Sequence, residues 1–290
     1  MSNKNIYQRS YHLTIVDELT GVSKTYTNLD IKFRVKKVMA PTRYTARISV
    51  LGLSWETMNN ISATSLYDIT TAAQKLKKRI ILKAGYVDNE VEIFGGYIVA
   101  ATIQSPPDMW LNMTVCNYVD FAEGSKSLSY GAGMTAKQIA FAVSDSLKIP
   151  IVYKCKNQEA ATTKLGPTVI SGNWSAIFKR LQKLASWEVF YDNGFIYIAD
   201  NSFADLSNEL ELTFNKRTGL IKVNSIDFIS CSITTFLNQN ANLSNIMNVE
   251  SELMPVVNGK YRIFTKEYFG HFRGKEWYST FYGMRINRKK

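Results

Sequence analysis

The side chains best suited to acid–base chemistry are few and scattered in this sequence. Its two histidines, His12 and His271, each lie within or beside an alternating β pattern, which is typical of a structural or exposed histidine. Glu188 and Asp192 are close in sequence, but a strand followed by a turn accounts for both carboxylates. The chain contains no HExxH, GxSxG or P-loop motif. We therefore predict that it is not an enzyme.

A glycine-rich stretch and three cysteines are the remaining places where a cofactor or metal ion could bind. Residues 131–133 precede a predicted helix, but they lack the Lys-Ser/Thr pair of a phosphate site and the spacing of a dinucleotide fingerprint. Cys116, Cys155 and Cys231 lie far apart and form no CxxC or Cys/His cluster. The sequence predicts no cofactor, no metal site and reduced cysteines.

The composition is that of a folded, β-rich protein. With 290 residues, 46% of them hydrophobic, the chain is long enough for two or three domains with a sizeable core. Tyrosine (16) and phenylalanine (15) are abundant and proline (6) is scarce, which favours β structure. No apolar run reaches the roughly 18 residues needed to cross a membrane, and the N-terminus lacks the apolar core of a signal peptide. We expect synthesis in the cytoplasm and no membrane insertion.

The chain is strongly basic, with a net charge of +11. Such a charge favours polyanionic partners, namely DNA, RNA or an acidic protein face. Basic residues cluster at 75–79 and 285–290 and are otherwise dispersed. Two interpretations remain open: a solvated face with a frayed C-terminus, or a positive surface that faces DNA or an acidic neighbour.

Residues 10–120 are predicted to be mainly β. Strict alternation predicts a half-buried strand at 29–36, apolar on one face and cationic on the other, and a second strand at 44–50. Ser54 is a suitable N-cap for a short helix over 55–61. A further strand is expected at 109–118.

The clearest hairpin of this region spans residues 79–98. Its two alternating strands are separated by polar residues at 87–90. Gly95 and Gly96 then allow the second strand to bend or bulge.

Residues 121–208 show a different, mixed pattern. Thr135 and Asn173 are predicted N-caps of two amphipathic helices. Strands at 187–191 and 195–199 flank an Asn-Gly turn, which predicts a second hairpin. Two stretches are predicted to be loops: 124–133 and 156–168. From residue 209 the chain returns to β, with strands expected at 210–214, 226–236, 261–268 and 276–286.

The sequence resembles baseplate hub proteins of contractile-tailed bacteriophages, the late-control-D-like tail hubs. Four stretches carry the resemblance: the hairpin at Gly85-Tyr86, the helix start at 133–140, the helix-hairpin unit at 171–200, and residues 254–261 before terminal strands that contain Trp277. Their order and spacing follow the family. The first 60 residues add a compatible β pattern.

The resemblance implies a mainly β fold with an α+β insert. Two tube-like β-barrel domains, at 1–120 and 209–290, would flank a two-helix middle domain at 121–208. By the same resemblance the chain forms a homotrimeric, pseudo-sixfold ring that joins the hexameric tail tube to the trimeric central spike and surrounds the ejection channel.

The expected partners follow from that role. They are further copies of the chain, a tail tube or tube-initiator protein, a trimeric spike protein, baseplate wedge proteins, and phage DNA in transit. The expected location is the tail baseplate of the virion. We expect ring contacts in the first hairpin and the last strands, at Gly85, Tyr86, Gly95, Gly96, Trp277, Tyr278 and Phe281.

Two other interpretations remain. Aromatic and basic residues interleave at 261–269 and 272–277, so a nucleic-acid-binding β surface is possible in this region. A tail tube or distal-tail structural protein is the other alternative. The sequence shows no repeat between its first and last β segments, so the similarity of the two barrels is implied by the family and not by these residues.

Overall fold

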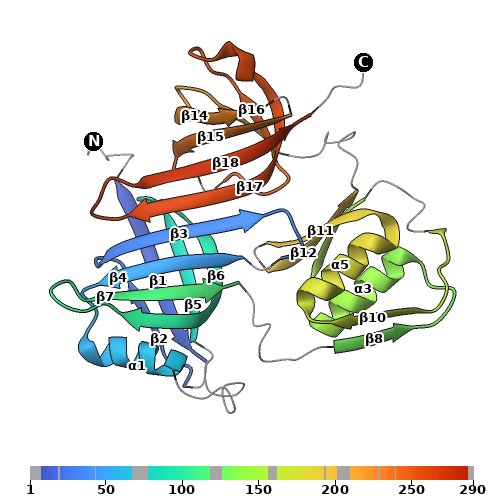
Figure 1. Cartoon of the computed structure of the whole chain (residues 1–290), viewed down its shortest axis with the longest axis horizontal. Coiled ribbons are helices and arrows are strands. Elements are labelled where there is room, and N and C mark those ends of the chain that lie inside the picture. The colour runs from blue at the N-terminus through green and yellow to red at the C-terminus, as the bar shows by residue number, and fades with distance from the viewer. Residues whose placement is uncertain are drawn as a thin grey trace. The chain divides into compact units, whose positions relative to one another are not determined.

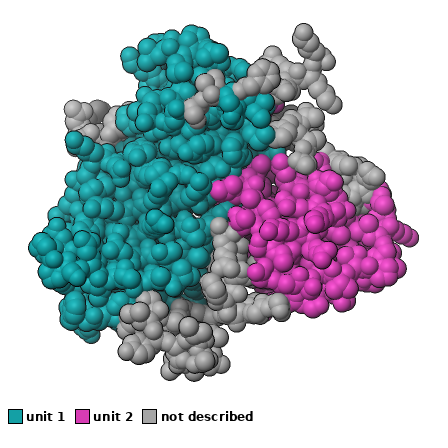
Figure 2. Space-filling view, in the orientation of Figure 1, with its two compact units in different colours: residues 1–37, 44–119, 210–285 teal, residues 38–43, 120–209, 286–290 magenta. Residues whose placement is uncertain are grey.

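The structure is a computed structural model of the chain. It describes residues 8–18, 20–42, 44–66, 78–117, 126–155, 162–192, 194–200, 210–227, 229–238 and 240–286. The chain divides into two compact units, coloured teal and magenta in Figure 2. The first unit comprises residues 1–37, 44–119 and 210–285, and the second comprises residues 38–43, 120–209 and 286–290. The first and last β segments of the sequence therefore belong to one unit.

The first unit is built on a 13-stranded sheet. Its strands are β1 (Arg9–Asp17), β2 (Ser23–Tyr26), β3 (Asp30–Val38), β4 (Thr45–Leu51), β5 (Lys78–Tyr86), β6 (Asn89–Ile103), β7 (Trp110–Cys116), β13 (Glu211–Phe214), β14 (Leu220–Ile226), β15 (Ser230–Phe236), β16 (Ile246–Val249), β17 (Gly259–His271) and β18 (Trp277–Arg285). A short 3-10 helix, η1 (Pro255–Val257), precedes β17. The mainly β character predicted from the sequence is confirmed.

The strand order joins the two ends of the sequence. It runs β14-β15-β18-β17-β3-β4-β7-β6-β5-β1-β2, and β13 and β16 attach through β17 (Figure 1). At the junction the Phe272 amide, just beyond β17, donates to the Ile31 carbonyl of β3 at 2.9 Å. Within the described residues no strand pairing joins β14 to β2, so no closed barrel is found.

Period-two patterning explains the core of this unit. In β3 the apolar side chains at 31, 33 and 35 are buried, whereas the cations at 32, 34 and 36 are exposed. The strand predicted at 29–36 is thus confirmed, with both faces as expected. The helix predicted after Ser54 is also present and is longer: α1 (Trp55–Leu66) begins where the Thr57 amide donates to the Ser54 hydroxyl, and it packs against β6.

Two details of the first hairpin differ from prediction. The turn is tighter, because Tyr86 pairs with Asn89 and leaves only residues 87–88 in the turn. The register shifts lie at Leu82/Lys83 in the β5–β6 pairing and at Ile98/Ala100 in the β6–β7 pairing, on either side of Gly95-Gly96.

The second unit is α+β. It contains β8 (Lys126–Tyr130), α3 (Ala136–Leu147), β9 (Ile151–Lys154), β10 (Thr168–Gly172), α5 (Trp174–Ala185), β11 (Trp187–Asp192) and β12 (Phe195–Asp200). Thr135 forms a capping box with Gln138 at the start of α3, and the Asn173 side chain accepts from the Ala176 amide at the start of α5. Both predicted helices and the second hairpin are confirmed.

Some predicted loops are wrong. Residues 126–130 form β8, which pairs with β10 at 168–172. The serine-rich composition of 124–133 concealed a short alternating strand whose partner lies far along the sequence. The single strand predicted at 226–236 is also wrong in part. A turn divides it, and in this turn the Asp227 side chain accepts hydrogen bonds from the backbone amides of Ile229 and Ser230. Residues 118–125, 156–161 and 67–77 lie outside the described residues.

Candidate functional site

The tip of the first hairpin depends on a glycine. A Cβ at Gly85 would lie 2.2 Å from the carbonyl oxygen of Asn89, closer than real Cβ atoms approach. The backbones of β5 and β6 therefore meet at a distance that only glycine permits. Tyr86, the next residue, lies opposite Arg9 of β1 and opposite Asn89 of β6.

Trp277 connects this tip to the last hairpin. The indole nitrogen of Trp277, at the start of β18, donates to the Gly85 carbonyl at 3.1 Å. The ring is 4% exposed and makes an edge contact with Phe33, with centroids 5.4 Å apart. A buried tryptophan with its N–H satisfied gives both apolar area and a fixed direction. Two stretches that were predicted to form ring contacts thus meet within one chain.

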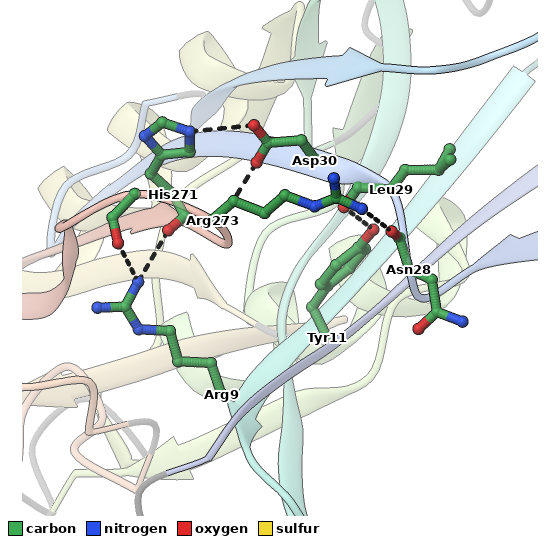
Figure 3. Close-up of polar contacts among 8 residues, drawn as sticks. Arg9, Tyr11, Asn28, Leu29, Asp30, His271 and Arg273 are labelled. Carbon is green, nitrogen blue, oxygen red and sulfur yellow. Dashed lines mark hydrogen bonds and ion pairs between the residues drawn. The ribbon is translucent and has the colours of Figure 1, made fainter.

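Arg9 holds the loop between β17 and β18 (Figure 3). Its guanidinium donates to the His271 carbonyl at 3.0 Å and to the Gly274 carbonyl at 2.5 Å, and it lies over the Trp277 ring at 5.6 Å. One side chain of β1 therefore satisfies carbonyls of a loop that is more than 260 residues away in sequence. We name the contacts of this loop with β1 and β3 the junction clamp.

Asp30 at the start of β3 completes the junction clamp. Its carboxylate lies 3.3 Å from Nε2 of His271 and accepts from the Arg273 amide at 3.3 Å (Figure 3). Nearby, the Tyr11 hydroxyl donates to the Leu29 carbonyl at 2.6 Å. Burial raises the pKa of Tyr11 to about 12, because the ionised phenolate would lose its hydration there.

Gly95 and Gly96 lie where β6 leaves β5 and joins β7. A Cβ at Gly96 would lie 2.1 Å from the Cys116 carbonyl oxygen of β7. At Gly95 the nearest atom would be a carboxylate oxygen of Glu92 at 2.7 Å, on a side chain that can move. Gly96 is therefore a point of backbone approach between strands.

The remaining predicted contact residues lie on β18. Phe281 is fully buried and packs on Phe214, with ring centroids 5.4 Å apart. Tyr278 is half-buried and stacks on Phe269 at 4.9 Å. Of these side chains only Tyr278 has surface available for a neighbouring subunit. Their role in ring contacts stays a prediction.

Comparison with protein families identifies the family of this chain. Residues 12–283 match the family described as Baseplate hub gp41. The chain belongs to this family of baseplate hub proteins. The family is one of structural components of phage tails, and the hub resemblance seen in the sequence is confirmed.

Solved structures agree with the family at the level of fold. A tail protein from Neisseria meningitidis MC58 has a TM-score of 0.62 at 9% identity, covering 95% of the hub and 96% of that chain. The 43 kDa tail protein of prophage MuSo2 from Shewanella oneidensis has a TM-score of 0.60 at 11% identity, covering 96% and 98%.

A third structure of similar fold comes from a secretion system. The Escherichia coli c3393 protein is described as a component of the type VI secretion system with structural similarity to the T4 tail proteins gp27 and gp5. It has a TM-score of 0.59 at 12% identity and covers 89% of the hub and 74% of that chain. A search of curated proteins found no match. Over the described part of the hub, no helix has the length and hydropathy to span a membrane.

The histidines and the glycine-rich stretch that were considered for chemistry take part in the packing and hydrogen bonding of the hub. His12 lies on β1 opposite Lys83, and His271 belongs to the junction clamp. The amide of Gly133 donates to the Leu165 carbonyl, so the glycine-rich stretch before α3 is bound to a neighbouring segment. Among the described residues no group of three or more His, Cys, Asp or Glu side chains could hold a metal ion.

The junction clamp was missed by sequence reasoning. Arg9, Asp30 and Arg273 carry no local motif, and the groups that they contact lie more than 240 residues away in sequence. The available signal was weak: an aspartate near the start of the strand predicted at 29–36, and an arginine just before the predicted β region that begins at residue 10.

Proposed function

We propose that this hub forms a trimeric, pseudo-sixfold ring at the baseplate of a contractile phage tail. The ring joins the hexameric tail tube to the trimeric central spike and surrounds the channel through which DNA is ejected. Each copy supplies two tube-like β domains, so three copies present six similar modules to the tube. The hub acts as a structural part of the virion and carries no catalytic step.

The observation that carries this proposal is the shared sheet of the first unit. The first and last β segments pair directly through β3 and β17, so two β modules are held as one body. β14 is the last strand of the order and offers its outer edge for pairing. An exposed strand edge is a ready site for another chain, and a closed ring covers such edges without open-ended growth.

Exposed apolar side chains lie beside that edge. Ile221 of β14 is 49% exposed, and Leu253 and Val256 in the segment before β17 are 94% and 68% exposed. Ile221 and Leu253 line a groove of about 870 Å³ between β14 and residues 250–258. Apolar groups gathered in this way typically mark a protein–protein contact, so we place a ring contact here as well as at the first hairpin and the last strands.

The partners are proposed from the family and its fold. The similarity of the E. coli relative to gp27 and gp5 supports a spike protein on one face of the ring. A tail tube or tube-initiator protein lies on the other face, and baseplate wedge proteins surround it. The chain is synthesised in the host cytoplasm and enters the virion without crossing a membrane.

Light scattering on a sizing column tests the ring. The chain has a mass of 32.9 kDa, so a trimer has a mass of about 99 kDa. We expect a trimer for the hub alone or after co-expression with its spike. A stable dimer or an open-ended polymer under both conditions would overturn the proposal.

A paired substitution tests the contact surface. Leu253→Asp should abolish the trimer, because a charge in an apolar contact is strongly unfavourable. Lys179→Asp on the exposed face of α5 is the control and should leave the solution mass at that of the trimer. Equal trimer formation by both variants would remove the groove from the ring contacts.

A further inference from the structure

One face of the large sheet carries a compact group of cations. Lys32, Arg34 and Lys36 project from the exposed face of β3, and Arg47 is exposed on β4. Figure 1 shows β17, β3 and β4 as neighbouring strands, in agreement with the strand order. Arg34 and Arg47 are direct cross-strand partners. We name these four residues the cationic face.

Placing two arginines opposite each other is unfavourable in an isolated sheet. Like charges at directly opposite positions destabilise a strand pair. An anion bound over the pair would remove that repulsion. The cationic face therefore carries positive charge that a further anion can neutralise.

Two of the cations make cation–π contacts with aromatic rings. The Lys32 ammonium lies 4.0 Å from the centroid of the Trp110 ring, and the Arg34 guanidinium lies 5.0 Å from that of Phe269. Cation–π contacts of this kind fix the direction of long side chains that would otherwise move freely. The charges are therefore held on the sheet surface before any ligand arrives.

Glu267 of β17 offsets part of this charge. Its side chain is only 3% exposed and lies 3.2 Å from the Arg34 guanidinium and 2.9 Å from the Lys36 ammonium, while those cations are 57% and 53% exposed. Among the described residues of the neighbouring strands, the carboxylates on this face are Glu267 and, at the end of β3, Asp30. Four cations thus face one central carboxylate.

The same face continues as a row of uncharged polar side chains. Glu267 lies opposite Thr280 of β18, whose hydroxyl lies 3.2 Å from that of Thr234 on β15. Thr234 in turn accepts from the Asn224 amide of β14 at 2.9 Å. On the other side, the Ser49 hydroxyl donates to the Asn112 side chain at 2.6 Å. Polar side chains therefore occur from β14 to β7, although Thr234 and Thr280 among them are buried.

We propose that the cationic face contacts the phosphate backbone of double-stranded DNA, and that Glu267 limits how tightly it does so. This inference rests on the proposed function, because a hub ring meets DNA only at ejection. Phosphate contacts by dispersed cations are independent of sequence, which suits a DNA that slides past. A carboxylate built into the cation cluster keeps the contact weak enough for release.

DNA fits this face better than an acidic protein surface does. β-strand cations at alternate positions stand about 7 Å apart. More than half of the Arg34 and Lys36 side chains is exposed, so their charges can reach phosphates. A protein contact would need apolar side chains at its centre. The centre here is charged.

A double substitution tests the cationic face with a labelled random-sequence DNA duplex, followed by fluorescence anisotropy between 50 and 200 mM salt. Lys32→Gln/Arg47→Gln should lower the salt-dependence slope by about 2 and weaken binding at 50 mM salt by about tenfold. Lys179→Gln/Arg180→Gln removes the same two charge types from the exposed face of α5 and should leave both values near those of the unaltered chain. Equal losses in the two variants would overturn the proposal.

Glu267→Gln tests the counter-charge in the opposite direction. The substitution keeps the size of the side chain and frees one net positive charge, so DNA binding should tighten about threefold with a steeper slope. If this variant unfolds, the double substitution still tests the face. A folded Glu267→Gln variant with unchanged DNA affinity would overturn the role given to Glu267.

The mass of each sample separates this inference from the proposed function. If the hub forms a trimer whose DNA binding is unchanged by Lys32→Gln/Arg47→Gln, the DNA contact is overturned and the ring proposal stands. If the chain binds DNA through the cationic face but never forms a trimer, the DNA contact stands and the ring proposal is overturned. If the unaltered chain instead binds an acidic protein and no DNA at 50 mM salt, the cationic face is a protein contact and the proposal fails.

Discussion

The two hairpins that meet at Trp277 hold their neighbours in different ways. In β5–β6 the strands approach through missing side chains: Gly85 and Gly96 each have a backbone oxygen within about 2.2 Å of where a Cβ would stand. In β17–β18 the contacts come from large side chains, as with Trp277 and Phe281, both buried. The β5–β6 hairpin depends on close backbone approach at glycines, whereas the β17–β18 hairpin depends on packing of aromatic rings. The two hairpins should therefore respond to substitution differently.

The largest expected effect is at Gly96. Gly96→Val would place side-chain atoms against the Cys116 carbonyl, where the neighbouring atom is backbone and cannot move aside. We expect the free energy of unfolding to fall by at least about 3 kcal/mol, measured by chemical denaturation.

Gly131→Val is the control for this substitution. Among the described residues no atom lies within 4 Å of a Cβ built at Gly131, so the change should stay within about 0.5 kcal/mol. If the two variants are equally stable, the first hairpin does not depend on backbone approach, and the contrast with β17–β18 is lost.

The sequence predicted the hairpins at 79–98 and 187–199 and the helices well, because their signals are local. Thr135 and Asn173 cap α3 and α5 with side chains three residues from their partners. The meeting of Trp277 with Gly85 joins residues 192 positions apart, and no pattern around either residue indicates the other. Two adjacent glycines suggested a bend, but they could not reveal that Cys116 lies against one of them.

The next effect concerns the contact between the hairpins. Trp277→Phe keeps a ring in the pocket but removes the donor to the buried Gly85 carbonyl. We expect a loss of about 2 kcal/mol in unfolding free energy, from an unsatisfied carbonyl and a small cavity. Tyr278→Phe on the same strand keeps its stack on Phe269 and should change stability by less than about 0.5 kcal/mol. Equal losses would mean that the indole hydrogen bond adds nothing.

A pH series tests the burial of Tyr11, which lies beside the junction clamp. The pKa of Tyr11 is raised from 10.0 to about 12 by burial, so the folded state favours the neutral phenol. This stabilisation is fully present below pH 10 and is lost as the pH rises toward 12, by on the order of 2 kcal/mol. Tyr11→Phe has no group to ionise, so its stability should fall less over the same interval. Parallel curves for the two proteins would contradict this assignment.

The smallest expected effect is the ion pair between His271 and Asp30. Both side chains are partly exposed, at 25% and 14%, so solvent screens their attraction. A double-mutant cycle with His271→Gln and Asp30→Asn should give a coupling of about 0.5 kcal/mol at low salt. The coupling should shrink at about 1 M salt, because salt screens the attraction between partly exposed charges. A coupling that is equal at both salt concentrations would show that a neutral hydrogen bond, and not charge, links β3 to the last hairpin. In that case the junction clamp depends on the hydrogen bonds of Arg9 to the His271 and Gly274 carbonyls and not on the charge of Asp30.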